Sequence, residues 1–226
     1  MEYTRQEIIN RINDAKSNMQ LFYKSDFVNY RGKTSDTDEY YTEVVCGWLL
    51  ENLELLNKIP VITREKGYAT KTHDGLIKNL KSNRDEEMIA MKMFNQKSIS
   101  GLGKILDYQT PLKNKSVDKV GKIDLLSYDG DILRILELKK PDSDETMLRC
   151  VIEGYTYLKT VDTKKLLQDF KLPQETMVVA NPFVFVDSVA YGEMFEDRPE
   201  LKELIRVLNC KPLFVKIENE KFVVEE

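Results

Sequence analysis

A single stretch near the middle of the chain, GKIDLLSYDGDILRILELKK at residues 121–140, restricts the fold most strongly. Two apolar runs flank Asp129-Gly130, a dipeptide that is typical of a two-residue hairpin turn. Successive side chains of a strand point to opposite faces, and here both faces are mainly apolar. We therefore predict a β-hairpin at the centre of a sheet, with helices covering both sides.

Charged residues interrupt one face of this hairpin near one end. If the DG pair forms the loop, Asp124 lies opposite Ile135 and diagonal to Glu137. The alternation of side chains then places Lys139 on the same face as both carboxylates. Burying two carboxylates and one ammonium together is costly unless they pair with each other or bind a metal ion. Asp124, Glu137 and Lys139 therefore form a candidate functional site.

Helical and extended patterns alternate along the chain. From residue 83 onward the order is a helix, three strands, a helix and a strand, followed by a further helix and closing strands. This order predicts an α/β fold for residues 83–226, with a mixed central β-sheet flanked by helices. In residues 1–82, a capping-box pattern at Thr4 and Glu7 and two amphipathic segments predict an N-terminal helical extension.

The composition is that of an ordinary globular protein. The 226 residues are 42% hydrophobic and 32% charged, enough for one sizeable domain or for a core with an added subdomain. Because the chain has no run of about 18 apolar residues and no signal-peptide pattern, we expect a cytoplasmic protein that does not enter membranes. The three scattered cysteines predict packed reduced thiols. The only histidine, His73, precedes Asp-Gly and is expected in a turn.

Lysines concentrate in residues 92–122. The net charge of −4 argues against a protein that coats nucleic acid indiscriminately, but this segment has seven lysines and only two aspartates. Such a run is commonly a solvated face. If the chain binds nucleic acid, we expect phosphates to approach this segment, at Lys104, Lys113, Lys115, Lys119 and Lys122.

The spacing of Glu137 and Lys139 carries little information by itself, since an acid two residues before a lysine occurs four other times in segments with a helical pattern. The apolar strand, the hairpin partner Asp124 and the preceding acidic helix set this instance apart. With these features, residues 83–185 resemble the PD-(D/E)xK nuclease superfamily, through the segments DEEMIAMKMF, GKIDLL, LELKK and EGYTY. The resemblance implies a restriction-endonuclease-like or Holliday-junction-resolvase-like core.

The resemblance also implies roles for the residues of the hairpin. Asp124 and Glu137 would hold Mg²⁺ or Mn²⁺, together with the carbonyl oxygen of Leu138. Lys139 would orient the attacking water and stabilise charge in the transition state. The metal ion would neutralise charge on phosphorus and supply a bound hydroxide as nucleophile.

Two helices would complete this site. Glu87 would be the acid of the first helix and a further metal ligand, with Glu86 as a close rival. Glu87 is preferred because apolar residues follow it three, four and seven positions later, which places it on the inward face of the helix. Glu153 and Tyr157 match the spacing of a Gln-x-x-x-Tyr pattern on the second core helix of the exonuclease and repair branch, and are expected as accessory residues.

The chain departs from the family pattern at two positions. Ile123 replaces the proline before the first strand acid, and a glutamate replaces the glutamine at position 153. Many members lack the proline, whereas the second departure leaves the role of Glu153 open. The Pro141-Asp142 pair follows the lysine, so we expect it to end the strand and not to act as the motif.

The resemblance implies a Mg²⁺-dependent nuclease that hydrolyses phosphodiester bonds, with DNA favoured over RNA as substrate, and it leaves both repair and defence against foreign DNA open as its setting. Nuclease domains of this type often work as homodimers. Two alternatives stay open. The chain could be a catalytically silent, nuclease-like module that binds nucleic acid or another partner, or the buried charges could serve folding alone.

Overall fold

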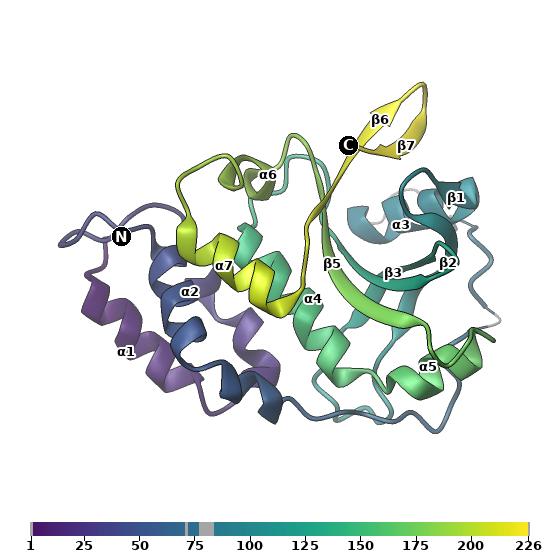
Figure 1. Ribbon diagram of the computed structural model, residues 1–226, viewed down its shortest axis with the longest axis horizontal. Helices are drawn as coiled ribbons and strands as arrows, with labels where there is room; N and C mark the ends of the chain where they lie inside the picture. The colour runs from purple at the N-terminus through teal and green to yellow at the C-terminus, as the bar shows by residue number, and fades with distance from the viewer. Residues whose placement is uncertain (1, 71, 77–83, 226) are drawn as a thin grey trace.

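The computed structural model describes residues 2–70, 72–76 and 84–225. These residues form an α/β fold in which a mixed seven-stranded sheet is flanked by helices, as the sequence predicts (Figure 1). The strands lie in the order β1-β2-β3-β4-β5-β6-β7, so each strand pairs with its neighbour in the chain. The first four strands are antiparallel, β4 to β6 are parallel, and β7 returns antiparallel to β6. The strands are β1 Ser98–Ile99, β2 Gly103–Pro111, β3 Lys122–Tyr128, β4 Ile132–Leu138, β5 Met177–Phe185, β6 Leu213–Glu218 and β7 Lys221–Val224.

Helices cover both faces of the sheet. On one face α3 packs with the β1–β4 side chains around a cluster that includes Met93, Leu125 and Leu136. On the other face α4 packs with α2 and α7 around a larger cluster that includes Leu126 and Leu148. The α-helices are α1 Arg5–Ala15, α2 Tyr41–Glu51, α3 Asp85–Gln96, α4 Met147–Thr160, α5 Thr163–Asp169, α6 Val189–Glu193 and α7 Pro199–Leu208, and the 3-10 helices are η1 Met19–Lys24, η2 Asp26–Asn29 and η3 Leu53–Lys58.

The sheet curls around α3. Gln96, the last residue of α3, exchanges two hydrogen bonds of 2.9 Å with the backbone of Phe222 in β7. The two edges of the sheet therefore approach each other on the α3 side, and the apolar side chains between them form a closed second core. This curl fixes the start of α3 over one end of the central strands.

The hairpin register differs from the prediction by two residues. Leu126 pairs with Ile135, and the amide of Asp129 donates to the carbonyl of Ile132 at 3.4 Å, so Gly130 and the next residue form the loop. Gly130 has a φ of +115°, which a two-residue hairpin turn requires and which glycine adopts without strain. A shift by two residues preserves the faces, and continuing the register by one pair places Asp124 opposite Glu137.

The N-terminal extension is helical, as expected, and its core is continuous with that of the sheet. The capping box at Thr4 and Glu7 is present, and α1 and α2 belong to the same hydrophobic cluster as α4 and α7. Glu43 of α2 accepts hydrogen bonds of 2.9 Å from the first two free amides of α7. The expected boundary between residues 82 and 83 lies outside the described residues.

Two further predictions concern membranes and thiols. Among the described residues, none of the helices is both long enough and apolar enough to cross a membrane. Cys46, Cys150 and Cys210 are buried free thiols, as the sequence predicts. Burial raises the pKa of each, so these thiols stay protonated and serve as packed side chains.

Candidate active site

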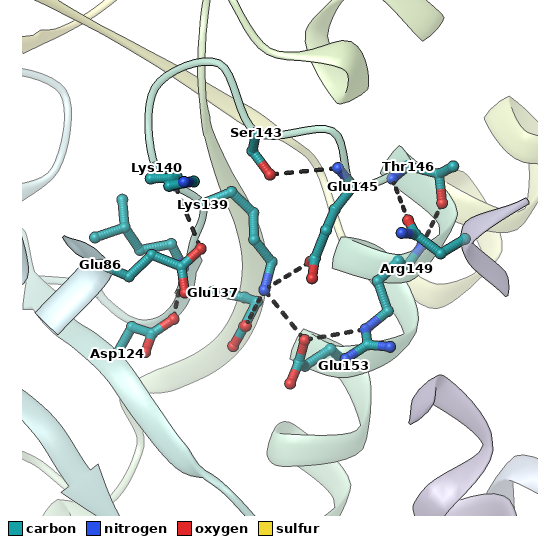
Figure 2. Close-up of polar contacts among 12 residues, drawn as sticks. Glu86, Asp124, Glu137, Lys139, Lys140, Ser143, Glu145, Thr146, Arg149 and Glu153 are labelled. Carbon is teal, nitrogen blue, oxygen red and sulfur yellow. Dashed lines mark hydrogen bonds and ion pairs between the residues drawn. The ribbon is translucent and has the colours of Figure 1, made fainter. Parts of the chain in front are cut away.

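Asp124 and Glu137 meet at the end of the central strands. They lie on adjacent strands, β3 and β4, and the backbone amide of Leu138 donates to Asp124 Oδ2 at 3.0 Å (Figure 2). Their residues are only 9% and 3% exposed. The convergence expected from the alternation of side chains is therefore present, with the two carboxylates on one face.

Lys139 binds three carboxylates at once. Its Nζ lies 2.8 Å from Glu137 Oε1, 3.0 Å from Glu145 Oε2 and 3.2 Å from Glu153 Oε2 (Figure 2). Burial alone would lower the pKa of Lys139, but the carboxylates outweigh this and hold that pKa well above its ordinary value. The lysine is therefore a fixed, charged group and not a general base.

Helix α4 supplies the second layer of this cluster. Glu153 accepts hydrogen bonds from Lys139, from Arg149 Nε at 3.4 Å and from the Tyr157 hydroxyl at 2.8 Å. Arg149, Glu153 and Tyr157 lie four positions apart on one face of α4, and the last two are the residues of the expected accessory pattern. Burial would raise the pKa of Glu153, but Lys139 and Arg149 keep it below its ordinary value, so Glu153 stays ionised.

Gly121 brings the start of β3 against α4. A Cβ atom at this position would collide with the hydroxyl of Tyr157. The absence of a side chain therefore allows the loop before β3 to contact the residue that orients Glu153. The sequence offered no signal for this contact, because it joins residues far apart in the chain.

The two strand carboxylates, Asp124 and Glu137, have raised pKa values, in contrast to Glu153. Burial raises the pKa of Asp124 to about 7, although Lys139 lowers it. Burial, followed by repulsion from Glu153, raises the pKa of Glu137 well above its ordinary value. Glu137 Oε2 is also buried without a hydrogen-bond partner among the described residues. The negative charge of Asp124 and Glu137 is therefore not fully balanced by the surrounding residues, and a bound cation would balance it.

The first helix contributes Glu86 to the cluster, and not the preferred Glu87. Glu86 Oε1 accepts a hydrogen bond from the backbone of Lys140 at 3.4 Å and lies beside Asp124 in Figure 2. Glu87 instead pairs with Arg84 at 3.2 Å. The reason is the buried stripe of α3. Its fully buried residues stand four and seven positions after Glu86, whereas the apolar residues that follow Glu87 at this spacing are only partly buried.

A cleft of about 590 Å³ opens onto these acids. Both helix acids line it, so Glu87 stays at the site even though it does not contact the strand carboxylates. Cationic groups stand beside the acids, which suits a ligand that carries negative charge around a bound cation. The cleft is lined by Arg84, Asp85, Glu86, Glu87, Gln109, Lys122, Asp124 and Lys140.

The five candidate phosphate-binding lysines do not form one group. Lys122 lines the cleft, and Lys113, Lys115 and Lys119 lie on the loop between β2 and β3, at the same end of the sheet. Lys104 pairs with Tyr128 beside the hairpin turn, at the opposite end of the strands. The structure therefore separates Lys104 from the site.

Three contacts of the site were not expected from the sequence. Glu145 binds Lys139 from the loop before α4, Gln109 of β2 donates to Asp124 Oδ1 at 2.9 Å, and Gly121 contacts Tyr157. None carries a local sequence signal, apart from the position of Glu145 just before the N-cap of α4. His73, which was expected in a turn, places Nδ1 2.6 Å from Asp107 Oδ1, a contact that the sequence did not indicate.

The donor set fits a hard divalent cation. No group of three acidic, histidine or cysteine side chains in the described ranges is already arranged around one point as a metal cage. The unpartnered Oε2 of Glu137 and the neighbouring Asp124 nevertheless supply oxygen donors, which Mg²⁺ and Mn²⁺ prefer. The amide and carbonyl of one strand residue point the same way, so the carbonyl of Leu138 also faces β3, where its amide binds Asp124.

No protein-family model, curated protein or solved structure matches this chain. Its function is therefore inferred from the residues of the site.

Proposed function

We propose that this protein is a metal-dependent nuclease of the PD-(D/E)xK type, which hydrolyses phosphodiester bonds of nucleic acid, preferentially DNA, with Mg²⁺ or Mn²⁺. One observation carries the proposal. Asp124 and Glu137 are buried on adjacent central strands with raised pKa values, and Lys139 is fixed beside them at the end of the sheet. Such an arrangement is costly for stability alone and useful once a cation binds.

The order of elements supports a restriction-endonuclease-like core. The chain runs through α3, then β2, β3 and β4, then α4 and β5, which is the helix, three strands, helix and strand of that core. The acids and the lysine lie on the second and third of these strands, and Glu153 and Tyr157 lie on the second helix. The resemblance in sequence and the order of elements thus agree on the same residues.

Asp124, Glu137 and the carbonyl of Leu138 would hold the cation, and Glu86, which lines the same cleft as Asp124, would complete the site directly or through water. A bound divalent ion polarises the phosphate and lowers the pKa of a coordinated water. The two oxygens of Glu137 would have different partners. Oε1 binds Lys139 at 2.8 Å, and Oε2, which has no hydrogen-bond partner among the described residues, would bind the cation. The side chain therefore links the ammonium to the proposed cation.

Lys139 would stabilise negative charge on the phosphate and orient the water next to the cation. A compact ammonium suits this task because its charge is concentrated, and since its three N–H groups are directed at Glu137, Glu145 and Glu153 it would act mainly through that charge. Glu145 and Glu153 hold its Nζ at 3.0 and 3.2 Å, so the lysine stays charged and in place before substrate arrives. Such preorganisation avoids the cost of moving the group during the reaction.

Nucleic acid would enter over the lysine-bearing end of the sheet. Lys122 and Lys140 line the cleft, and the β2–β3 loop with Lys113, Lys115 and Lys119 extends from the same end. Phosphates bound by these lysines would release counterions, so binding should weaken steeply with salt. Lys104 is left out of this surface because it lies at the far end of β2.

A silent binding module is the second candidate, and one contact favours it. Lys139 is already paired with three carboxylates, as a purely structural lysine would be. This reading leaves Glu137 Oε2 and the raised pKa of Asp124 without a purpose, so we prefer the nuclease.

A cleavage assay tests the proposal. The full chain is incubated with single-stranded, duplex and branched DNA and RNA, with Mg²⁺, Mn²⁺, Ca²⁺ or a chelator. We expect cleavage with Mg²⁺ or Mn²⁺, binding with little turnover in Ca²⁺, and none in chelator. Glu137→Gln should abolish cleavage, whereas Asp131→Asn, which removes an exposed carboxylate at the far end of the same hairpin, should not. Metal-independent binding without cleavage on every substrate would favour the silent module.

A further inference from the structure

One polar side chain in the cleft has no part in the mechanism described so far. Gln109 of β2 donates from Nε2 to Asp124 Oδ1 at 2.9 Å. Its neighbours Tyr108 and Thr110 pair with Leu125 and Ile123 of β3, so Gln109 faces Asp124 across the strands. Together with the Leu138 amide on Oδ2, this hydrogen bond fixes both oxygens of the carboxylate.

The backbone of Gln109 is held in an unusual conformation. Its φ is +50°, in the left-handed region that non-glycine residues rarely adopt, and still more rarely inside a strand. The pairing of β2 with β3 also shifts by one residue between Ile105 and Asp107, just before this point. Strain of this kind persists only where the surroundings enforce it, and it is most frequent at functional sites.

A separate network keeps this irregular segment in place. The Thr110 hydroxyl donates to Asp107 Oδ2 at 3.0 Å, which bridges the strained residue from one side to the other. His73 lies 2.6 Å from the second oxygen of Asp107 and stacks on Tyr108 with ring centroids 4.6 Å apart. The residues on both sides of Gln109 are therefore braced by contacts that do not involve Asp124.

We propose that Gln109 is a positioning residue, which holds the Asp124 carboxylate in the orientation that binds the divalent cation. This inference rests on the proposed function. Glycine or asparagine would occupy a left-handed strand position with less strain. Glycine has no side-chain amide, however, and the amide of asparagine reaches less far than that of glutamine. The amide of Gln109 binds one oxygen by its hydrogen and leaves the second lone pair of that oxygen for the metal.

The energetic role follows from the chemistry of metal ligands. A carboxylate that is already oriented loses less freedom when the cation binds, and removing such an outer partner typically weakens metal binding about 10- to 100-fold. The rival interpretation is that Gln109 only satisfies a buried carboxylate. In that case its loss lowers the stability of the fold and leaves the affinity for metal unchanged once the protein is folded.

Two substitutions separate these interpretations. Gln109→Asn keeps an amide and tolerates the left-handed backbone, but it is one methylene shorter. Gln109→Gly removes the side chain and its hydrogen bond to Asp124 but relieves the backbone strain, and because these two effects offset each other the fold should be about as stable as the wild type. Gln6→Asn, on the exposed face of α1, is the matched control.

The experiment is a Mn²⁺ titration of the full chain by calorimetry, with thermal unfolding of each variant in chelator. We expect both Gln109 variants to bind Mn²⁺ about 10- to 100-fold more weakly than the wild type, with no loss of melting temperature for Gln109→Gly and no change for the control. Wild-type affinity in both variants, or an affinity loss that accompanies a loss of melting temperature in Gln109→Gly, overturns the role of Gln109 alone. A wild type that binds no Mn²⁺ overturns the proposed function, and this inference with it.

Discussion

Lys139 and Glu153 form a buried ion pair, with 3.2 Å between Nζ and Oε2, that joins strand β4 to helix α4. The pair lies on one side of Glu137, and Glu86 of α3 lies on the other side, next to Asp124 (Figure 2). Lys139 is thus held from one side by Glu145 and Glu153 and touches Glu137 on the other. Glu145 and Glu153 therefore position the lysine, whereas Glu137 keeps one oxygen available to a cation.

Lys139→Ala should separate catalysis from packing. Removing the ammonium leaves three carboxylates without their cation, so metal-free protein should lose about 3–5 kcal/mol of unfolding free energy. Saturating Mg²⁺ should restore most of that stability and none of the activity, which we expect to fall about 100-fold or more. Thermal unfolding with and without Mg²⁺, together with cleavage rates, measures both.

The matched control is Lys164→Ala, which removes an exposed lysine from another acid-x-Lys pair and should change neither quantity. A Lys139→Ala protein that stays unfolded in saturating metal, or one that cleaves at the normal rate, would remove Lys139 from the mechanism.

Glu153→Gln should keep much of the activity. Lys139 retains Glu137 and Glu145 as partners, and a glutamine can still accept one hydrogen bond, so we expect cleavage within about 10-fold of the wild type. The buried hydroxyl of Tyr157 and the half-buried guanidinium of Arg149 would be less well satisfied, at a cost of about 1–3 kcal/mol. Glu54→Gln, on an exposed position of η3, is the control. A folded Glu153→Gln protein with no activity would make Glu153 a direct participant in the reaction.

Gly121→Ala should disturb the site from outside it. The new methyl group collides with the hydroxyl of Tyr157, which orients Glu153, so we expect a loss of about 1–3 kcal/mol by overpacking and a slower cleavage rate. Gly192→Ala provides the contrast, because a methyl group there has no heavy atom within 4 Å. Equal melting temperatures and rates for both variants would show that the contact with Tyr157 is not needed.

Stability should depend on pH through Asp124. Its pKa is about 7 in the folded protein, well above the ordinary value of about 4, so the folded state keeps a proton that the unfolded state has lost in this interval. The contribution of Asp124 to the stability of metal-free protein should therefore fall as the pH rises from about 4 to about 7 and then level off, and Glu137, whose pKa is also raised, adds a decline of the same sign. Stabilisation by Mg²⁺ should grow over the same interval, because the cation needs the ionised carboxylate.

Melting temperatures across this pH range, with and without Mg²⁺, measure the effect. Asp124→Asn should remove the Asp124 share of the metal-free decline, leaving that of Glu137, and should abolish the response to Mg²⁺. An Asp124→Asn profile that matches the wild type would assign the pH dependence to other groups.

The hairpin and its charged face could be predicted because side-chain alternation is a local property of a strand. The register was wrong by two residues, since a DG pair can supply either both loop residues or the last strand residue and the first loop residue. Asp129 takes the second arrangement because its carboxylate accepts the amides of Asp131 and Ile132 at 3.0 and 2.9 Å. The assignment of side chains to the two faces was nevertheless correct, because a register shift by two residues leaves each side chain on the same face.

The acid of α3 could not be chosen from the sequence alone. Apolar residues follow both Glu86 and Glu87 at helical spacing, and only the packing of α3 inside the curled sheet decides which stripe is buried. Gln109 and Glu145 were missed for a similar reason, since their contacts depend on how distant segments pack. The separation of Lys104 from the other four lysines could have been predicted from the sequence. Lys104 lies seven residues before the end of β2, and seven residues of a strand span about 23 Å.

The most direct test of the carboxylate pair is anomalous diffraction from a crystal of the full chain soaked in Mn²⁺. The account predicts a Mn²⁺ ion bonded to Asp124 and Glu137 at about 2.1 Å, with the Leu138 carbonyl as a further ligand and Lys139 still bound to Glu153. Crystals that hold no Mn²⁺ at these carboxylates, while Lys139 remains enclosed by its three glutamates, would contradict it and leave the cluster with a structural role.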